Sequence, residues 1–255
     1  AGREIVDLVH SDWQIATRER PGRDLREIAA EPPTARPAPR HLDVRVRRTL
    51  DLNTTIPEVA DHGLYPQRPG WPVVADRHPV VPLTMEVMLV REAAEAELPG
   101  VRVIAVRAIQ AYNWLVVASP CNVEITLKSV ASATGEQLLE AAIEGYFKAE
   151  LVLAPSYPPA LTTAMAPLRR PRATAVAAAD LYRDHWMFHG PAYQGVTRFT
   201  AIGDDGIDGE VRVPTGKGAL LDNMGQLAGY WVMEQPANCL AMPIGVAAIR
   251  FFDVD

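Results

Sequence analysis

An apolar helix that carries an acidic residue near its start is the strongest constraint on how this chain folds. Residues 220–231 read LLDNMGQLAGYW, and their apolar side chains recur at the spacing of a helix face. Such a helix packs against a large apolar surface. Asp222 and Gln226 are one turn apart, so both polar side chains leave the same side of the helix. Because a buried carboxyl group needs a partner or a task, Asp222 is either the N-terminal cap of the helix or a functional group.

A second helix, preceded by a histidine, is predicted far upstream. Residues 59–88 read VADHGLYPQRPGWPVVADRHPVVPLTMEVM. The prolines and glycines between His62 and Pro82 forbid regular structure there, and Pro82 suits the first turn of a helix that continues to about Leu98. The early part of this helix is apolar on nearly every side, so other structure must surround it. A histidine before one buried helix and an aspartate in another form a candidate base and acid pair.

Strand-like segments surround the two predicted helices. Residues 42–47 alternate between apolar and charged, as in a half-buried strand. Turn residues separate several further runs and predict an antiparallel meander; the runs are 101–111, 113–118, 121–130 and 140–153. The second half repeats this order. It begins with a partly helical segment at 173–186, a turn entering a strand at 188–196 and a hairpin at 199–213. The Asp222 helix at 220–231 and a last strand at 244–252 follow. The sequence therefore predicts an α+β fold with two antiparallel sheets, each wrapped around a central helix.

Proline-rich segments mark the expected boundaries. EPPTARPAPR at 31–40 and PSYPPALTTAMAPLRRPR at 155–172 both predict extended linkers. The chain is therefore expected to divide into a lead-in, an N-terminal unit, a proline-rich linker and a C-terminal unit, at residues 1–41, 42–154, 155–173 and 174–255. Few strands follow the Asp222 helix, so the C-terminal unit is expected to be truncated at its C-terminal end.

Composition argues against several classes of function. The chain has 255 residues and a formal net charge of −6, and no basic patch interleaves with aromatic residues, which argues against nucleic acid as a partner. No run approaches ~18 consecutive apolar residues, so no membrane span is expected. Cys121 and Cys239 have neither metal-ligand spacing nor the pattern of a disulfide framework, which suits a reducing, cytoplasmic setting. The histidines lack the HxxH and HExxH spacings, so no metal is expected.

Three motifs occur in a suggestive order. They are VADHGLYPQRPGWPVVADRHPVVPLTM, MFHGPAYQGV and LLDNMGQLAGYW. In this order they resemble the catalytic-histidine segment, the Gly-Pro-x-aromatic-Gln motif and the Asp-x-x-x-Gln motif of the dehydratase domains of modular or iterative type I polyketide synthases. The resemblance covers about residues 42–255. It implies a double hot-dog fold, with a catalytic histidine in the N-terminal hot-dog and a catalytic aspartate in the C-terminal one.

The resemblance also implies what the site residues do. His62 matches the catalytic base, Asp222 the catalytic acid and Gln226 the residue that hydrogen-bonds near that acid. Four further positions match the substrate site: Pro82, which opens the first central helix, and the turn residues Gly190, Pro191 and Tyr193. The implied reaction is loss of water from a β-hydroxyacyl thioester. The substrate is carried on the phosphopantetheine of an acyl carrier protein and no other cofactor is needed. Neighbouring synthase domains are further implied partners, and a homodimer is compatible with the resemblance.

Several alternatives stay open. In the family a proline follows the catalytic histidine by nine residues, whereas His62 lies 20 residues before Pro82. His78, four residues before Pro82, is therefore a rival base, and we favour His62 because it follows Asp61 as in the family's pattern. His189 either lines the site or packs within its turn. The alternative functions are a hot-dog double-bond isomerase, a thioesterase-like module, and a catalytically idle docking domain of a synthase.

The proposed roles require particular protonation states. With a reference pKa of about 6.5, His62 is expected to be neutral at pH 7 and able to accept a proton. The apolar setting of its helix is expected to raise the pKa of Asp222, so that the carboxyl group holds the proton that a leaving hydroxyl needs. Free amide N–H groups at the start of the Pro82 helix are expected to polarise the thioester carbonyl.

Overall fold

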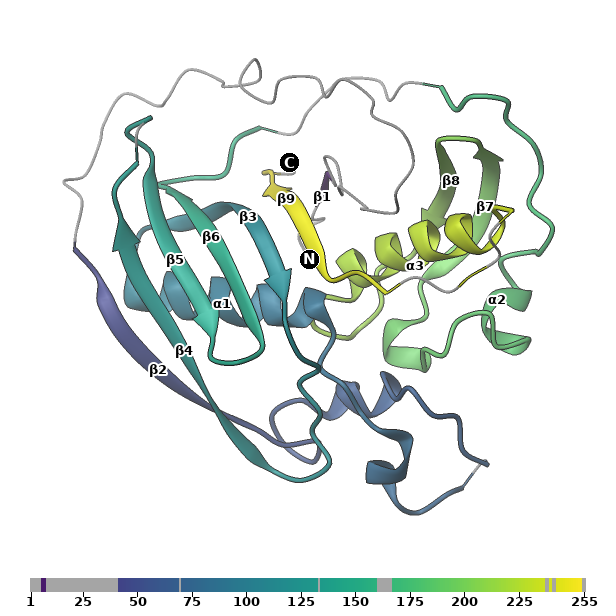
Figure 1. The fold of residues 1–255 in the computed structure, drawn as a ribbon, viewed down its shortest axis with the longest axis horizontal. Coiled ribbons are helices and arrows are strands. Elements are labelled where there is room, and N and C mark those ends of the chain that lie inside the picture. The colour runs from purple at the N-terminus through teal and green to yellow at the C-terminus, as the bar shows by residue number, and fades with distance from the viewer. Residues whose placement is uncertain are drawn as a thin grey trace.

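The computed structural model describes residues 6–7, 41–68, 70–132, 134–159, 167–236, 239 and 242–253. In these residues a large antiparallel sheet and a smaller antiparallel hairpin are each accompanied by one long helix (Figure 1). The strands of the large sheet are, in spatial order, β1 (Val6–Asp7), β9 (Gly245–Phe251), β3 (Arg102–Ala111), β6 (Phe147–Ala154), β5 (Gln137–Ile143), β4 (Cys121–Val130) and β2 (Asp43–Leu50). The mixture of helices and antiparallel sheets agrees with the predicted class.

Alternation of apolar and polar side chains explains the outer strands of the large sheet. On β4, the side chains of Val123, Ile125 and Leu127 point into the core, and those between them are more exposed. β2 pairs with β4 in an unbroken antiparallel register from Asp43 to Leu50. The sequence predicted β4 with its observed bounds because this alternation is regular.

Two strand predictions were wrong in detail. Residues 140–153 were expected to form one run, but they contribute to the hairpin of β5 and β6. Gly145 has a φ of 82° in the turn of this hairpin, a conformation that favours glycine. Residues 113–118 were expected to form a strand, but there Val116 makes only an isolated bridge with Val80.

The first long helix, α1 (Leu83–Glu97), packs against the large sheet. It begins directly after Pro82, whose backbone is extended, and ends before Leu98, as the sequence predicted. The side chains of Met85, Val87, Val90 and several other apolar residues are fully buried between α1 and strands β3 to β6. This burial fixes the start of α1, and with it the loop that carries His62.

The second half of the chain builds its own layer around α3 (Ala219–Met233). The hairpin of β7 (Val196–Gly203) and β8 (Gly206–Val211) lies against this helix (Figure 1). The helical part of 173–186 is limited to the short helix α2 (Asp180–Arg183). No helix in the described part of the chain is long and apolar enough to cross a membrane.

The starts of α1 and α3 lie against each other. Gly218 precedes α3 with a φ of 73°, and a Cβ atom placed on it would lie 2.7 Å from the carbonyl group of Thr84. Only glycine therefore fits at this contact without a shift of the backbone. The close approach brings the first turns of both helices, with Asp222 on one of them, to the same region.

β9 links the two halves of the chain. It comes from the second half, yet it pairs with β3 of the first half, with Arg250 opposite Ala105. The described strands therefore divide into sheets of seven and two, rather than into one sheet around each helix as the sequence suggested. β1 lies within the expected lead-in and pairs with the other edge of β9. The rest of that lead-in, and residues 160–166 of the expected linker, lie outside the described residues.

Candidate active site

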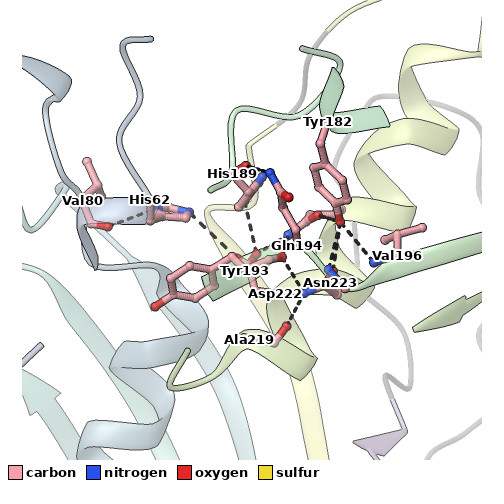
Figure 2. Close-up of polar contacts among 12 residues, drawn as sticks. His62, Val80, Tyr182, His189, Tyr193, Gln194, Val196, Ala219, Asp222 and Asn223 are labelled. Atoms are coloured by element: carbon pink, nitrogen blue, oxygen red, sulfur yellow. Dashed lines mark hydrogen bonds and ion pairs between the residues drawn. The ribbon is translucent and has the colours of Figure 1, made fainter. Parts of the chain in front are cut away.

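His62 is buried and held in one tautomer. It follows the short helix η2 (Pro57–Asp61), and only 6% of its surface is exposed. Its Nδ1 atom lies 2.8 Å from the carbonyl oxygen of Val80. Because a carbonyl can only accept, Nδ1 carries the hydrogen and Nε2 keeps a free lone pair. Figure 2 shows that the free nitrogen points toward Asp222, whose Oδ1 atom is 4.0 Å away.

Asp222 faces the histidines and does not cap its helix. The N-cap position of α3 is occupied by Gly218, and Asp222 lies in the first turn after it. Its Oδ2 atom accepts hydrogen bonds from Nε2 of Gln226 at 2.7 Å and from Nε2 of His189 at 3.2 Å. Oδ1 is left facing His62. Of the two interpretations that the sequence allowed, the N-terminal cap is therefore wrong.

The hydrogen bonds of Asp222 reverse the expected direction of its pKa. Burial disfavours the carboxylate, as the sequence suggested, but the hydrogen bond and charge of His189, the charge of His62 and the hydrogen bond from Gln226 outweigh it, so the pKa of Asp222 is lowered. The expected rise was therefore wrong. Burial lowers the pKa of His62 to about 4, although the charge of Asp222 acts against that change. The imidazole of His62 is neutral at pH 7.

His189 is the third member of the site. Its ring stacks on Phe188 with 4.2 Å between ring centroids and lies 5.1 Å from the ring of His62. Its backbone carbonyl accepts a hydrogen bond from Gln194. Nδ1 of His189 is buried and has no hydrogen-bond partner among the described residues. The sequence left open whether His189 lines the site or packs within its turn, and the structure places it in the lining of the site.

The turn at Gly190 joins the His189 segment to the His62 segment. The amide of Gly190 donates to the carbonyl of Asp61 at 2.6 Å, and the Asp61 carboxylate accepts the amide of Ala192 at 2.9 Å. A Cβ atom on Gly190 would lie 2.6 Å from the Asp61 carboxylate. Pro191 opens the short helix η4 (Pro191–Tyr193) that follows. The Gly-Pro motif is therefore a contact that positions the two histidines.

We expect Gly190→Ala to damage both stability and activity. The added methyl group must displace the Asp61 carboxylate, which would break its bond to Ala192 and move the adjacent His62. The free energy of unfolding should fall by about 1–3 kcal/mol, and kcat/KM should fall with it. Gly225→Ala is the matched control for thermal stability, since no atom lies within 4 Å of the added group. An unchanged melting temperature for Gly190→Ala would contradict this account of the turn.

A second layer of polar groups orients Gln226. Its amide nitrogen donates to the carbonyl of Tyr193 at 2.9 Å as well as to Asp222, and its Oε1 accepts the hydroxyl of Tyr182 at 2.8 Å. Asn223 donates to the same Tyr193 carbonyl at 2.8 Å (Figure 2). The sequence did not indicate Tyr182 or Asn223, because their role depends on contacts between segments far apart in the chain. The only sequence signal for either residue is that Asn223 directly follows Asp222.

His62, His189 and Asp222 line one apolar cavity. It has a volume of about 390 Å³ and lies between the two long helices. Its lining includes Pro82 directly before α1, Leu83 on α1, and Leu221 and Met224 on α3. Tyr112 and Trp114 also line the cavity, and more than half of each side chain is exposed. An elongated apolar group can therefore enter and reach His62 and Asp222.

His78 lies elsewhere. It follows the short helix η3 (Val74–Arg77) with a left-handed backbone, and its ring faces the exposed rings of Tyr65 and Trp114. It is not among the residues that line the cavity. The structure therefore brings Asp222 together with His62 and not with the rival histidine.

The central triad also has the donor set of a metal site. His62, His189 and Asp222 each offer one ligand atom, and these atoms lie within 4.8 Å of one another. Two imidazoles and a carboxylate suit zinc or ferrous iron. The sequence predicted no metal because the usual histidine spacings are absent, whereas the structure assembles this donor set from three segments that are far apart in the chain.

Comparison with known proteins identifies the fold. No family model matches the chain, and no curated protein matches its sequence. Similar solved structures include the dehydratase domain from the CurJ module of curacin polyketide synthase, with 14% identity over 84% of this chain and 76% of that one and a TM-score of 0.57. The dehydratase domain from the CurF module is 15% identical over 82% and 81%, with a TM-score of 0.56. The dehydratase domain of PpsC from Mycobacterium tuberculosis is 18% identical over 81% and 78%, with a TM-score of 0.54. The chain thus has the hot-dog fold of polyketide synthase dehydratase domains.

Proposed function

We propose that this protein is a polyketide synthase dehydratase domain with a double hot-dog fold. It would remove water from a β-hydroxyacyl thioester carried by an acyl carrier protein and give the α,β-unsaturated thioester. The observation that carries this proposal is the free Nε2 of His62, which faces Oδ1 of Asp222 across 4.0 Å at the wall of an apolar cavity. The gap is longer than a hydrogen bond, so a substrate's α and β carbons can lie against both groups.

His62 is the proposed base. The Val80 carbonyl fixes the tautomer, and the lowered pKa keeps the imidazole neutral. Nε2 would take the proton from the α carbon, while the electrons of that C–H bond form the new double bond. The amides of Met85 and Glu86 already donate to the carbonyl of Pro82. The N–H groups of Leu83 and Thr84, at the start of α1, are therefore the ones proposed to stabilise negative charge on the thioester oxygen.

Asp222 is the proposed acid, and its proton would be recycled. As the bond between the β carbon and oxygen breaks, the hydroxyl takes the proton from Oδ1 of Asp222 and leaves as water. The imidazolium of His62 then returns the α proton to the Asp222 carboxylate, which restores the starting state. The cycle needs one proton on the pair, and with both pKa values lowered the empty site carries none at pH 7. The proposal therefore requires bound substrate to raise the pKa of Asp222, so that the carboxyl group holds that proton.

The lowered pKa of His62 predicts an acid-shifted pH profile. The neutral base is lost only when His62 is protonated, so the acidic limb of kcat/KM should lie near the His62 pKa of about 4 instead of 6.5. Measuring kcat/KM from pH 3.5 to 9 on buffers of constant ionic strength checks the position of this limb. An acidic limb near pH 6.5 would mean that His62 is not held neutral as described.

Metal independence is a separate expectation. If the triad works as base and acid, dialysis against a chelator should leave the rate unchanged, and added Zn²⁺ should inhibit by binding His62, His189 and Asp222. Metal content by elemental analysis and rates before and after dialysis decide the point. Loss of activity on chelation, restored by one particular metal, would replace this mechanism with a metal-assisted one.

Product analysis tests the proposed function. The protein should convert 3-hydroxyacyl thioesters of pantetheine, or of a carrier protein, to products lighter by the mass of one water. An isomerase would move a double bond without a change of mass, a thioesterase would release the free acid, and an idle docking domain would leave every thioester intact. Each of those three results would refute the dehydratase proposal.

A further inference from the structure

A second carboxyl group, unused by the base and acid pair, lines the same cavity. Glu86 lies on the first turns of α1, and only 2% of its surface is exposed. Its Oε1 atom is buried without a hydrogen-bond partner among the described residues. Leaving such an atom unpaired destabilises the fold. A carboxyl group kept in this state against an open cavity is suited to a ligand that would pair it.

The surroundings of Glu86 define what that ligand must be. The described lining of the cavity contains neither lysine nor arginine, and the side chains across from α1 include Leu221, Met224 and Ala228 of α3. Burial in this apolar setting raises the pKa of Glu86 to about 8, so at pH 7 its carboxyl group is neutral and carries a hydrogen. A neutral carboxyl group pairs with an uncharged oxygen, since its hydrogen can be donated to that oxygen.

Its position relates Glu86 to the acyl chain of a substrate. Pro82 and the free amides after it mark the proposed thioester end, and Glu86 follows Pro82 by one turn, or about 5–6 Å along the helix. Val87 on α1 and Gly229 on α3 line the same cavity. A chain whose β carbon lies between His62 and Asp222 would therefore carry its more distant carbons past Glu86.

We propose that Glu86 forms a specificity site that binds a hydroxyl or carbonyl oxygen on the acyl chain beyond its third carbon. This inference rests on the proposed function and narrows its substrate class to oxygenated acyl chains. A plain hydrocarbon chain would leave the buried Oε1 atom of Glu86 unpaired, which is how a polar pocket rejects an analogue that lacks the polar group.

Binding of unreactive thioesters tests the proposal without requiring catalysis. The probes are saturated acyl-pantetheine thioesters of equal length that lack the β-hydroxyl group, either plain or with one keto group at successive positions beyond the third carbon. Calorimetry on the full chain should show the best keto chain binding about 10–100-fold more tightly than the plain chain. In Glu86→Leu the ratio should fall to about one, whereas Glu86→Gln, whose amide can still donate, should keep part of it.

Glu97→Leu is the matched control, because Glu97 is an exposed residue at the far end of the same helix. This variant should keep the full ratio. Equal binding of keto and plain chains to the wild type, or a preference that survives in Glu86→Leu, would overturn the proposal. Tighter binding of a chain with a terminal amine would overturn it too, since that would assign an ionised Glu86. Saturated thioesters cannot lose water, so these results stand apart from whether the protein is a dehydratase.

Discussion

Asp222→Asn should lower the rate of dehydration by two orders of magnitude or more, while the protein stays folded. The amide keeps the shape of the carboxyl group and can still accept the hydrogen bond from Gln226. With its oxygen at the position of Oδ2, the amide can also accept from Nε2 of His189, and its NH2 group then faces the free Nε2 of His62. What Asn lacks is an acidic proton for the leaving hydroxyl. Steady-state rates on a 3-hydroxyacyl thioester, with melting temperatures on the same samples, measure both effects.

Asp208→Asn is the control for this substitution, because Asp208 is an exposed aspartate on β8, outside the cavity lining. Its rate should match the wild type. A fully active Asp222→Asn protein would leave His62 without an acid partner, and the two-residue mechanism would have to be abandoned. A fall in rate accompanied by a large fall in melting temperature would instead assign Asp222 to the stability of the fold.

His62→Ala should abolish dehydration, with a loss on the order of 10²–10⁴ or more in kcat. The imidazole is the proposed acceptor of the α proton, and the other imidazole beside Asp222, that of His189, already donates to Oδ2. Truncation also removes ring contacts with Phe188, His189 and Tyr193, so stability should fall too. His62→Asn, which keeps a donor for the Val80 carbonyl, separates the loss of the base from the loss of packing.

His78→Ala is the decisive comparison, since His78 is the alternative base that the sequence allows. His78 does not line the cavity, and its ring faces Tyr65 and Trp114, so this variant should keep most of the activity. If His78→Ala is inactive and His62→Ala still turns over, the assignment of the base across the long loop is wrong.

Local patterns were enough to predict most helices and strands. The alternation in β4 and the proline before α1 gave bounds close to those observed, because both signals depend on neighbouring residues. The place of β9 in the large sheet was not predictable in this way. Its pairing with β3 joins residues more than a hundred positions apart, and periodicity indicates that a strand exists without indicating its partner.

The site was predictable where its residues share one helix. Asp222 and Gln226 lie on one face of α3 because they are one turn apart, and the structure joins them by a hydrogen bond. The contributions of His189 and Tyr182 come from other segments, and so does the sign of the pKa change at Asp222. Burial alone predicts a raised pKa; the lowered value requires the donors that tertiary contacts bring to Oδ2.

The most direct test of the central claim is the reverse reaction in labelled water. An enoyl thioester incubated with the protein in water enriched in heavy oxygen should become a 3-hydroxyacyl thioester, with the label on the β carbon alone. The rate of labelling should fall together in His62→Ala and Asp222→Asn, since both groups act on the same water. Label that never appears, or that appears equally fast in wild type and both variants, would contradict the account of His62 and Asp222 as base and acid.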